Sequence, residues 1–213
     1  MRLELGCPVD ALDGPFGELA DVVVDPIHQR VTHLVVQPHH RHRLARLVPA
    51  ELAKGDDASS AISIGRTTAE LQRMPSVEEF AYVRFGEFPV DDPGWDVGVE
   101  TILAQPYYDS PGFGAGPMDV DPRSAILYDR IPTGEVEIRR ASAVFSADDH
   151  HVGHVDGFLV DGGDVITHVV LERGHLFTRR VVAVPIGAVA RVATDRVRLR
   201  LTRDEVAALP SMA

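Results

Sequence analysis

The chain carries one sequence pattern twice, and a duplicated chain is expected to fold as two copies of the same unit. Val31–Val36 (VTHLVV) returns as Ile166–Leu171 (ITHVVL), 135 residues further along. Other matches keep a spacing of 135 or 136 residues: Gly17 with Gly153, Asp25 with Asp161, Val48-Pro49 with Val184-Pro185, and Thr67 with Thr202. Constant order and spacing indicate a tandem repeat. The chain therefore divides into a first repeat (1–76), a linker (77–137) and a second repeat (138–213).

Each repeat has the pattern of short β-strands joined by tight turns. In the first repeat, Glu18–Asp25 is rich in β-branched residues, Asp25-Pro26 favours a turn, and Val31–Val36 is a second strand. We therefore predict an antiparallel hairpin, which the second repeat copies with Gly162-Gly163 at its turn. Alternation along the strand would place His33 on the same face as Val31 and Val35. Further strands are predicted at 44–48, 61–64, 180–184 and 196–201.

Both repeats end with the sequence signature of a short helix. Thr67 with Glu70, and Thr202 with Glu205, match a capping box, in which the threonine side chain and the glutamate each bond a free backbone N–H. Pro75 and Pro210 stop the two helices. Several short strands followed by one helix favour a small closed barrel, because closure removes exposed strand edges. The predicted fold is mainly β, with two small barrels, each closed by one C-terminal helix.

These motifs resemble the PRC-barrel family. The matching residues in the first repeat are Gly6, Val9, Asp13-Gly14, Gly17, Asp21–Asp25, Val31–Val36, Val48-Pro49 and Thr67–Pro75. The family includes the cytoplasmic domain of the photosynthetic reaction centre H subunit and the C-terminal domain of a ribosome-maturation factor. The resemblance implies a binding module and no catalyst, and it leaves open a role as an RNA- or ribosome-associated maturation factor. It covers the two repeats and omits the linker.

The linker is acidic, aromatic and rich in proline and glycine. It holds 13 acidic and 3 basic residues, 9 of the 13 aromatic residues, and 7 of the 15 prolines. This composition predicts an irregular segment that packs on the barrels, because exposing many aromatic rings to water is unfavourable. Its rings either join the two barrels or dock a partner, and disorder is a third reading. The partner-docking candidates are Tyr107, Tyr108 and Phe113.

Two histidine clusters have metal-ligand character, and the first comprises His39, His40 and His42 in one loop. His150, His151 and His154 lie within five residues, and imidazole is a ligand for zinc, copper or nickel. The alternative is a set of solvated loop histidines, because the spacing fixes no geometry. The first repeat has Gly14-Pro15 and Glu18 at the places of this second cluster, so a metal site there would belong to the second repeat alone. We assign no cofactor and no catalytic residue.

The charge balance disfavours nucleic acid without excluding it. The formal charge is −11, from 21 Lys and Arg against 32 Asp and Glu. Phosphate binding requires a local surplus of basic residues. Arg196, Arg198 and Arg200 alternate along a predicted strand and would share one face, so Arg198 and Arg200 are candidates for contact with RNA or an acidic partner.

Composition also predicts where the protein acts. Cys7 is the single cysteine, which suits a reducing compartment. Residues 1–20 show no signal peptide, and no run is long and apolar enough to cross a membrane. Arginine far outnumbers lysine, which hints at a GC-rich bacterial genome. We expect a soluble bacterial protein of the cytoplasm, and a homodimer is the assembly that we expect if the chain self-associates. Its predicted function is a non-catalytic interaction or assembly module with a protein partner, and the alternatives are RNA association and metal binding through the histidines.

Overall fold

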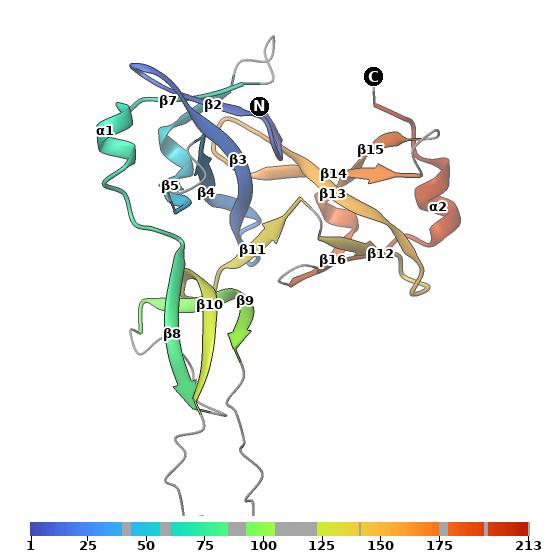
Figure 1. The fold of residues 1–213 in the computed structure, drawn as a ribbon. Coiled ribbons are helices and arrows are strands. Elements are labelled where there is room, and N and C mark those ends of the chain that lie inside the picture. The colour runs from blue at the N-terminus through green and yellow to red at the C-terminus, as the bar shows by residue number, and fades with distance from the viewer. Residues whose placement is uncertain are drawn as a thin grey trace, which may run out of the picture.

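The computed structural model is built almost entirely of β-strands, arranged in two curled sheets and one smaller sheet (Figure 1). The structure describes residues 1–39, 44–55, 61–84, 93–104, 123–140, 142–174, 179–193 and 196–212. The first repeat is blue to cyan in Figure 1, and the second is orange to red. Each large sheet curls into a half-barrel around its apolar side chains.

The first repeat supplies most of one seven-stranded sheet, with the order β5-β4-β3-β2-β7-β6. Its strands are β2 (Pro8–Ala11), β3 (Gly14–Asp25), β4 (Arg30–Pro38), β5 (Arg46–Pro49), β6 (Ala53–Gly55) and β7 (Ile62–Ile64), with a 3-10 turn at Ala50–Leu52. The predicted hairpin is β3 and β4, and neighbouring strands are antiparallel except β2 and β7, which are parallel.

The second repeat supplies most of the other seven-stranded sheet, in the equivalent order β15-β14-β13-β12-β17-β16. Its strands are β12 (Ala143–Phe145), β13 (His151–Val160), β14 (Ile166–Arg173), β15 (Arg180–Pro185), β16 (Val189–Ala193) and β17 (Arg196–Leu199), with a 3-10 turn at Ile186–Ala188. The parallel pair recurs as β12 and β17. The two repeats therefore share strand order and strand direction as well as sequence.

Each sheet is completed by a strand from outside its own repeat. Strand β1 (Arg2–Glu4), at the start of the chain, pairs with β13 of the second repeat and places Leu3 opposite Phe158. Strand β11 (Val136–Arg139), just before the second repeat, pairs with β3 of the first and places Ile138 opposite Val22. The exchange is reciprocal, and β11 spans the predicted boundary between linker and second repeat.

The two repeats also contact each other directly. The β3–β4 turn meets the β13–β14 turn, where the Ile166 N–H donates to the Gln29 carbonyl at 2.8 Å and the Val31 N–H donates to the Asp164 carbonyl at 3.0 Å. One cluster of buried side chains runs through both half-barrels, from Leu3 in β1 to Val206 near the C-terminus. The two half-barrels, expected to pack together through the linker, therefore also pack on each other directly. The halves share one core.

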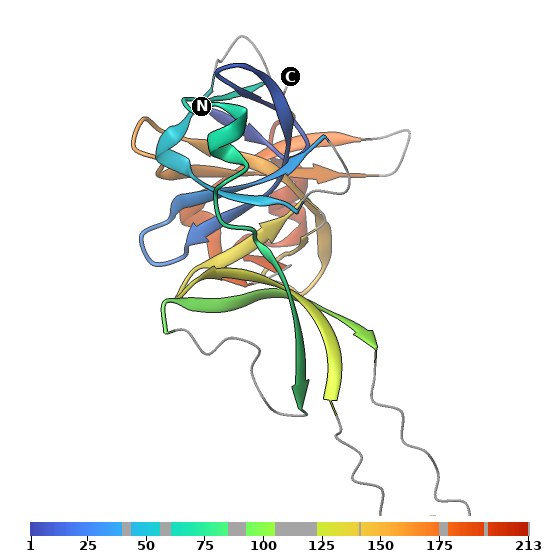
Figure 2. The same ribbon diagram turned by 60° about the vertical axis from the view of Figure 1, so that its left-hand side comes forward.

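The composition of the linker predicted an irregular segment, but the described residues of the linker form a third sheet. Strands β8 (Glu78–Arg84), β10 (Arg123–Pro132) and β9 (Trp95–Ala104) pair antiparallel in that order. This sheet projects from the first repeat (Figure 2). Most of the linker's prolines and glycines lie between these strands, whereas the strands are rich in β-branched and aromatic residues. Average composition concealed that segregation.

One end of the linker sheet packs on the outer face of the first half-barrel. Ile131 of β10 and Val77 are buried in a second apolar cluster with three residues of β3, β4 and β5, namely Val23, Val35 and Leu47. Trp95 of β9 packs against the same cluster. The prediction that linker side chains pack on the barrels is confirmed here for Trp95.

Both predicted capping boxes form. Helix α1 (Thr68–Leu71) starts at the N-cap Thr67, and helix α2 (Arg203–Ala208) starts at the N-cap Thr202. The first helical N–H of each also donates to an aspartate, Asp13 in α1 at 2.7 Å and Asp148 in α2 at 3.0 Å. These aspartates are equivalent in the repeat, so the same three caps were duplicated. Of the helices described, none is long and apolar enough to span a membrane.

Candidate functional site

The duplicated histidines have a structural setting in both repeats. In β4 the extra residue of a β-bulge is Thr32, and its hydroxyl donates to the Val23 carbonyl at 3.1 Å. Thr167 does the same for the Leu159 carbonyl at 3.0 Å. A histidine follows each threonine. The Nδ1 of His33 lies 3.2 Å from the Thr32 hydroxyl, and the Nδ1 of His168 lies 3.1 Å from the Thr167 hydroxyl. In both repeats the threonine therefore supplies a hydrogen-bond donor to a backbone carbonyl at the bulge, and the histidine lies beside that threonine.

The three histidines of the second cluster do not converge, and His40 and His42 of the first cluster lie outside the described residues. The rings of His151 and His154 are neighbours on β13, with centroids 4.7 Å apart. His150 instead turns to Asp148, with its Nδ1 3.1 Å from the carboxylate. Across the described residues, no group of three or more His, Cys, Asp or Glu side chains is arranged to hold a metal ion.

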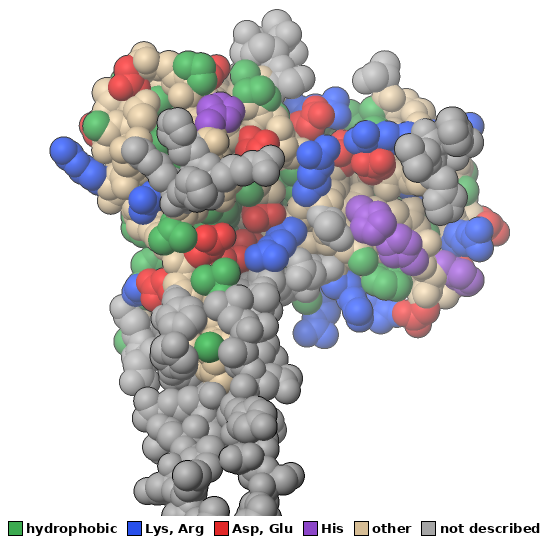
Figure 3. Space-filling view, viewed as in Figure 1, with side chains coloured by type: hydrophobic (Ala, Val, Ile, Leu, Met, Phe, Trp, Pro, Cys, Tyr) green, Lys and Arg blue, Asp and Glu red, His purple; other side chains and the backbone are tan. Residues whose placement is uncertain are grey.

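An aromatic and cationic ladder crosses the second sheet beside these histidines. The ring of Phe145 on β12 lies 5.6 Å from that of His151, and the guanidinium of Arg196 on β17 lies 5.0 Å from the Phe145 ring centroid. His151, His154 and Arg196 are exposed. Figure 3 shows histidine side chains over β13, with basic side chains over β16 nearby. We call His154, His151, Phe145 and Arg196 the ring ladder.

The two arginines predicted as a partner surface both bond within the chain. Arg198 pairs with Asp149, which its guanidinium contacts directly. The Arg200 Nε lies 3.4 Å from the Val189 carbonyl oxygen. Both residues are exposed, so they lie on a basic surface, yet their donors are partly used. The other partner candidates, Tyr107, Tyr108 and Phe113, lie outside the described residues.

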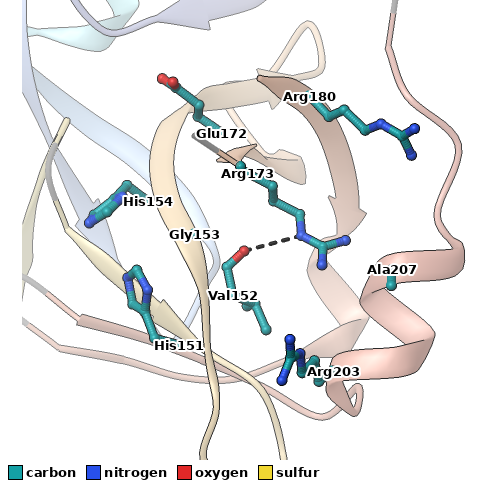
Figure 4. Close-up of a pocket in the computed structure, with 10 residues that line it drawn as sticks. His151, Val152, Gly153, His154, Glu172, Arg173, Arg180, Arg203 and Ala207 are labelled. Atoms are coloured by element: carbon teal, nitrogen blue, oxygen red, sulfur yellow. Dashed lines mark hydrogen bonds between the residues drawn. The ribbon is translucent and has the colours of Figure 1, made fainter. Parts of the chain in front are cut away.

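Three arginines that the sequence did not single out line a pocket in the second repeat. The pocket has a volume of about 550 Å³ and spreads around the start of β13 (Figure 4). Arg173, Arg180 and Arg203 lie on one side of that strand, whereas His151 and His154 lie on the other. We call the side lined by these arginines, Val152 and Ala207 the arginine pocket. Glu172 points away from it.

The arginine pocket belongs to the second repeat alone. The matching residues of the first repeat are Pro38 for Arg173, Leu44 for Arg180 and Thr68 for Arg203, by spacings of 135 or 136. Aligning the two copies and asking where the second gains positive charge would have identified these three arginines from sequence, but not that they line one pocket. The comparison applies because both copies share the same strand order.

The outer face of the second half-barrel differs from that of the first. In the first repeat the residues Val23, Ala45, Leu47 and Val77 are buried beneath Ile131 of the linker sheet. The equivalent residues of the second repeat are all half-buried: Leu159, Val181, Ala183 and Met212. We call these four residues the open face.

A charged group borders the open face. Asp156 is only 3% exposed, and its carboxylate lies 3.5 Å from the Arg179 guanidinium, which also pairs with Glu172 at 2.8 Å. The matching residue in the first repeat is Ala20, which packs against the covered cluster. A polar border beside an apolar patch is the usual composition of a protein interface.

Neither the models of known protein families nor the curated proteins contain a match for this chain.

Proposed function

We propose that this chain is a non-catalytic interaction protein that docks a protein partner on the open face of its second repeat. In this proposal the half-barrels are PRC-like barrels, each closed by its C-terminal helix. The observation that carries the proposal is the difference between the two outer faces. Ile131 and Trp95 of the linker sheet pack on one face, while Leu159, Val181, Ala183 and Met212 remain half-buried on the other.

The covered face indicates what kind of partner fits. In the first repeat the occupant is a β-strand that inserts one aliphatic side chain, Ile131, with Trp95 beside it. A partner for the second repeat would present a similar apolar strand with an aromatic residue. Its polar rim would face Arg179, whose side chain is 53% exposed and so remains accessible at the edge of the patch. Aromatic anchors surrounded by a polar rim are common in protein interfaces.

The residues that the repeats share support a binding role. The equivalent residues Thr32 and Thr167 donate to backbone carbonyls at the bulges, and the equivalent residues Thr67 and Thr202 cap the helices. Duplication has thus retained groups that maintain the fold, whereas the surfaces have diverged. Divergence in surface with retention of fold is expected when one scaffold serves different partners.

The test is native capture from the source cell with a charge placed on the open face. The variant Leu159→Asp/Ala183→Asp is compared with the unchanged chain and with Ile27→Asp, a control on a side chain that is 83% exposed. We expect one protein to be captured by the unchanged chain and the control, and lost from the folded open-face variant. The captured protein is then purified and titrated against all three chains.

Two results would overturn the proposal. One is capture by the open-face variant equal to that of the unchanged chain, which would place the partner elsewhere. The other is turnover of a physiological substrate by the purified chain. Capture of a second copy of this chain through the open face would identify the partner as the homodimer mate.

RNA association is a second candidate, and the ring ladder favours it. Exposed rings beside arginines can stack on unpaired bases. Phe145→Ala/Arg196→Gln would weaken binding of single-stranded RNA at low salt, where the phosphate contribution is greatest. Absence of RNA binding by the unchanged chain at low salt would remove this candidate.

A further inference from the structure

We propose that the arginine pocket of the second repeat binds a phosphate group. This site is separate from the open face, so it adds a ligand to the proposed interaction protein. Its three guanidinium groups come from β14, β15 and the first turn of α2, and they surround Val152 and Ala207 (Figure 4).

Arg173 is held in place before any ligand arrives. Its Nε donates to the Val152 carbonyl at 3.1 Å, and its Nη1 donates to the Val206 carbonyl at 2.7 Å. Two bonds to backbone atoms fix the plane of the guanidinium, which has five N–H donors. The remaining donors are therefore oriented, and an oriented guanidinium loses less entropy when it binds an oxyanion.

The positive charge of the arginine pocket is not balanced by the chain. Within the described residues, no carboxylate forms an ion pair with Arg173, Arg180 or Arg203. Two neighbouring carboxylates have other partners. Glu172 pairs with Arg179, and Asp148 accepts from the Arg203 backbone N–H and pairs with His150.

What distinguishes these three arginines is that they line one pocket, since other described arginines such as Arg66 and Arg191 also form no ion pair. The formal charge of the chain is −11, and several other arginines, including Arg130 and Arg139, are paired with carboxylates. Neighbouring like charges repel, and a bound anion removes that repulsion. Three arginines without carboxylate partners that line one pocket have the electrostatics of an anion site.

The fold does not require these charges. The first repeat builds the same strands and helix with Pro38, Leu44 and Thr68 at the matching positions. Because the half-barrel forms without them, Arg180 and Arg203 are explained better by a ligand than by stability, whereas Arg173 also anchors α2 through its bond to the Val206 carbonyl.

A phosphate fits this site better than a carboxylate. Guanidinium groups bond either anion in a forked geometry, but three of them match an anion of charge about −2 rather than −1. The arginines come from three separate elements, and the pocket also has apolar lining, so the site could hold a second phosphate or an organic body beside the first. Val152 and Ala207 would contact that remainder.

Calorimetric titration of the full chain tests the proposal. The ligands are inorganic phosphate, inorganic diphosphate and ribose 5-phosphate, with acetate as the carboxylate control. The variant Arg180→Gln/Arg203→Gln removes two charges and keeps Arg173, which anchors α2. The matched control, Arg66→Gln/Arg73→Gln, removes two exposed arginines near α1, so both variants have the same net charge.

We expect one phosphate ligand per chain, with equal affinity in the unchanged chain and the control. The affinity should fall about tenfold or more in Arg180→Gln/Arg203→Gln, as expected for lost charge-assisted hydrogen bonds. Tighter binding of diphosphate would identify an inorganic polyphosphate, and tighter binding of ribose 5-phosphate an organic ester. The proposal is overturned if no phosphate ligand binds at millimolar concentration, if acetate binds equally well, or if both variants lose affinity equally.

Discussion

Leu3 lies directly opposite Phe158, so the first strand of the chain belongs to the sheet of the second repeat. Ile138 lies opposite Val22 in the reciprocal arrangement. All four side chains belong to the same buried cluster. Neither half-barrel can therefore lose its borrowed strand without opening the core of the other, and the chain should unfold in one transition.

Substitution of Gly157 tests this exchange. A Cβ at Gly157 would overlap the carbonyl oxygen of Leu3, so Gly157→Ala should displace β1 and lower the free energy of unfolding by about 2 kcal/mol. Urea unfolding followed by circular dichroism measures the loss. Gly162→Ala is the control, because nothing lies within 4 Å of its added Cβ. Equal stability of the two variants would mean that β1 is not held on β13.

Truncation of Ile131 should uncover the outer face of the first repeat. Ile131 is 1% exposed and packs on Val23, Val35 and Leu47. Ile131→Ala should lower the free energy of unfolding by about 2–4 kcal/mol. Trp95 packs beside it and is the only tryptophan, so its fluorescence should shift to the red. An unchanged emission maximum would contradict the packing of the linker sheet on this face.

The repeat predicted the elements well because its signals are local. Both hairpins and both capping boxes formed where β-branched runs, turn residues and Thr-x-x-Glu patterns placed them. Local contacts also explain why both repeats have a glycine at the equivalent positions Gly17 and Gly153. A Cβ on Gly17 would overlap the Gln37 carbonyl, and one on Gly153 would overlap the Glu172 carbonyl.

Bulges and long-range pairing were not accessible from the pattern. Alternation placed His33 on one face with Val31 and Val35, but the bulge at Thr32 puts Val31 in the inner cluster and Val35 in the outer one. Strands β1 and β11 are too short to signal their partners, which lie in the other repeat. The arginine pocket combines residues far apart in the sequence, so it appears only once the strands are placed.

Arg139 of β11 forms an ion pair with a buried acidic residue of the linker sheet. Its guanidinium pairs with Asp129, which is 6% exposed. Burial disfavours the charge on Arg139, but Asp129 and Glu137 outweigh that cost and hold its pKa above the usual value. Burial raises the pKa of the Glu78 carboxyl, and Asp129 raises it further, while Arg139 opposes the rise.

Arg139→Gln should therefore destabilise the chain most at neutral pH. We expect a loss of about 2 kcal/mol at pH 7, less than for a fully buried pair because the Arg139 side chain is 35% exposed. Without the guanidinium, the pKa of Glu78 rises further above its unfolded value. The folded variant then binds more protons than the unfolded one, so the deficit should shrink as pH falls towards about 5. Arg139→Lys should retain part of the stability, and a deficit that is constant with pH would contradict the electrostatic cause.

Cys7 should be unreactive in the folded chain. Burial, followed by the charge of Glu4, raises the pKa of its thiol to about 11, and the residue is 5% exposed. A disulfide reagent at about pH 8 should modify the thiol only as the chain opens, since the thiolate is the reactive form. Reaction of the native chain as fast as of the urea-unfolded chain would contradict this burial.

The most direct test of the proposed function is hydrogen exchange of the chain with and without its captured partner. The open face predicts new protection in β13 and β15 around Leu159 and Val181, and at Met212. The outer face of the first repeat, already covered by Ile131, should remain unchanged. Protection confined to the first repeat or the linker sheet would contradict the proposal that the second repeat docks the partner.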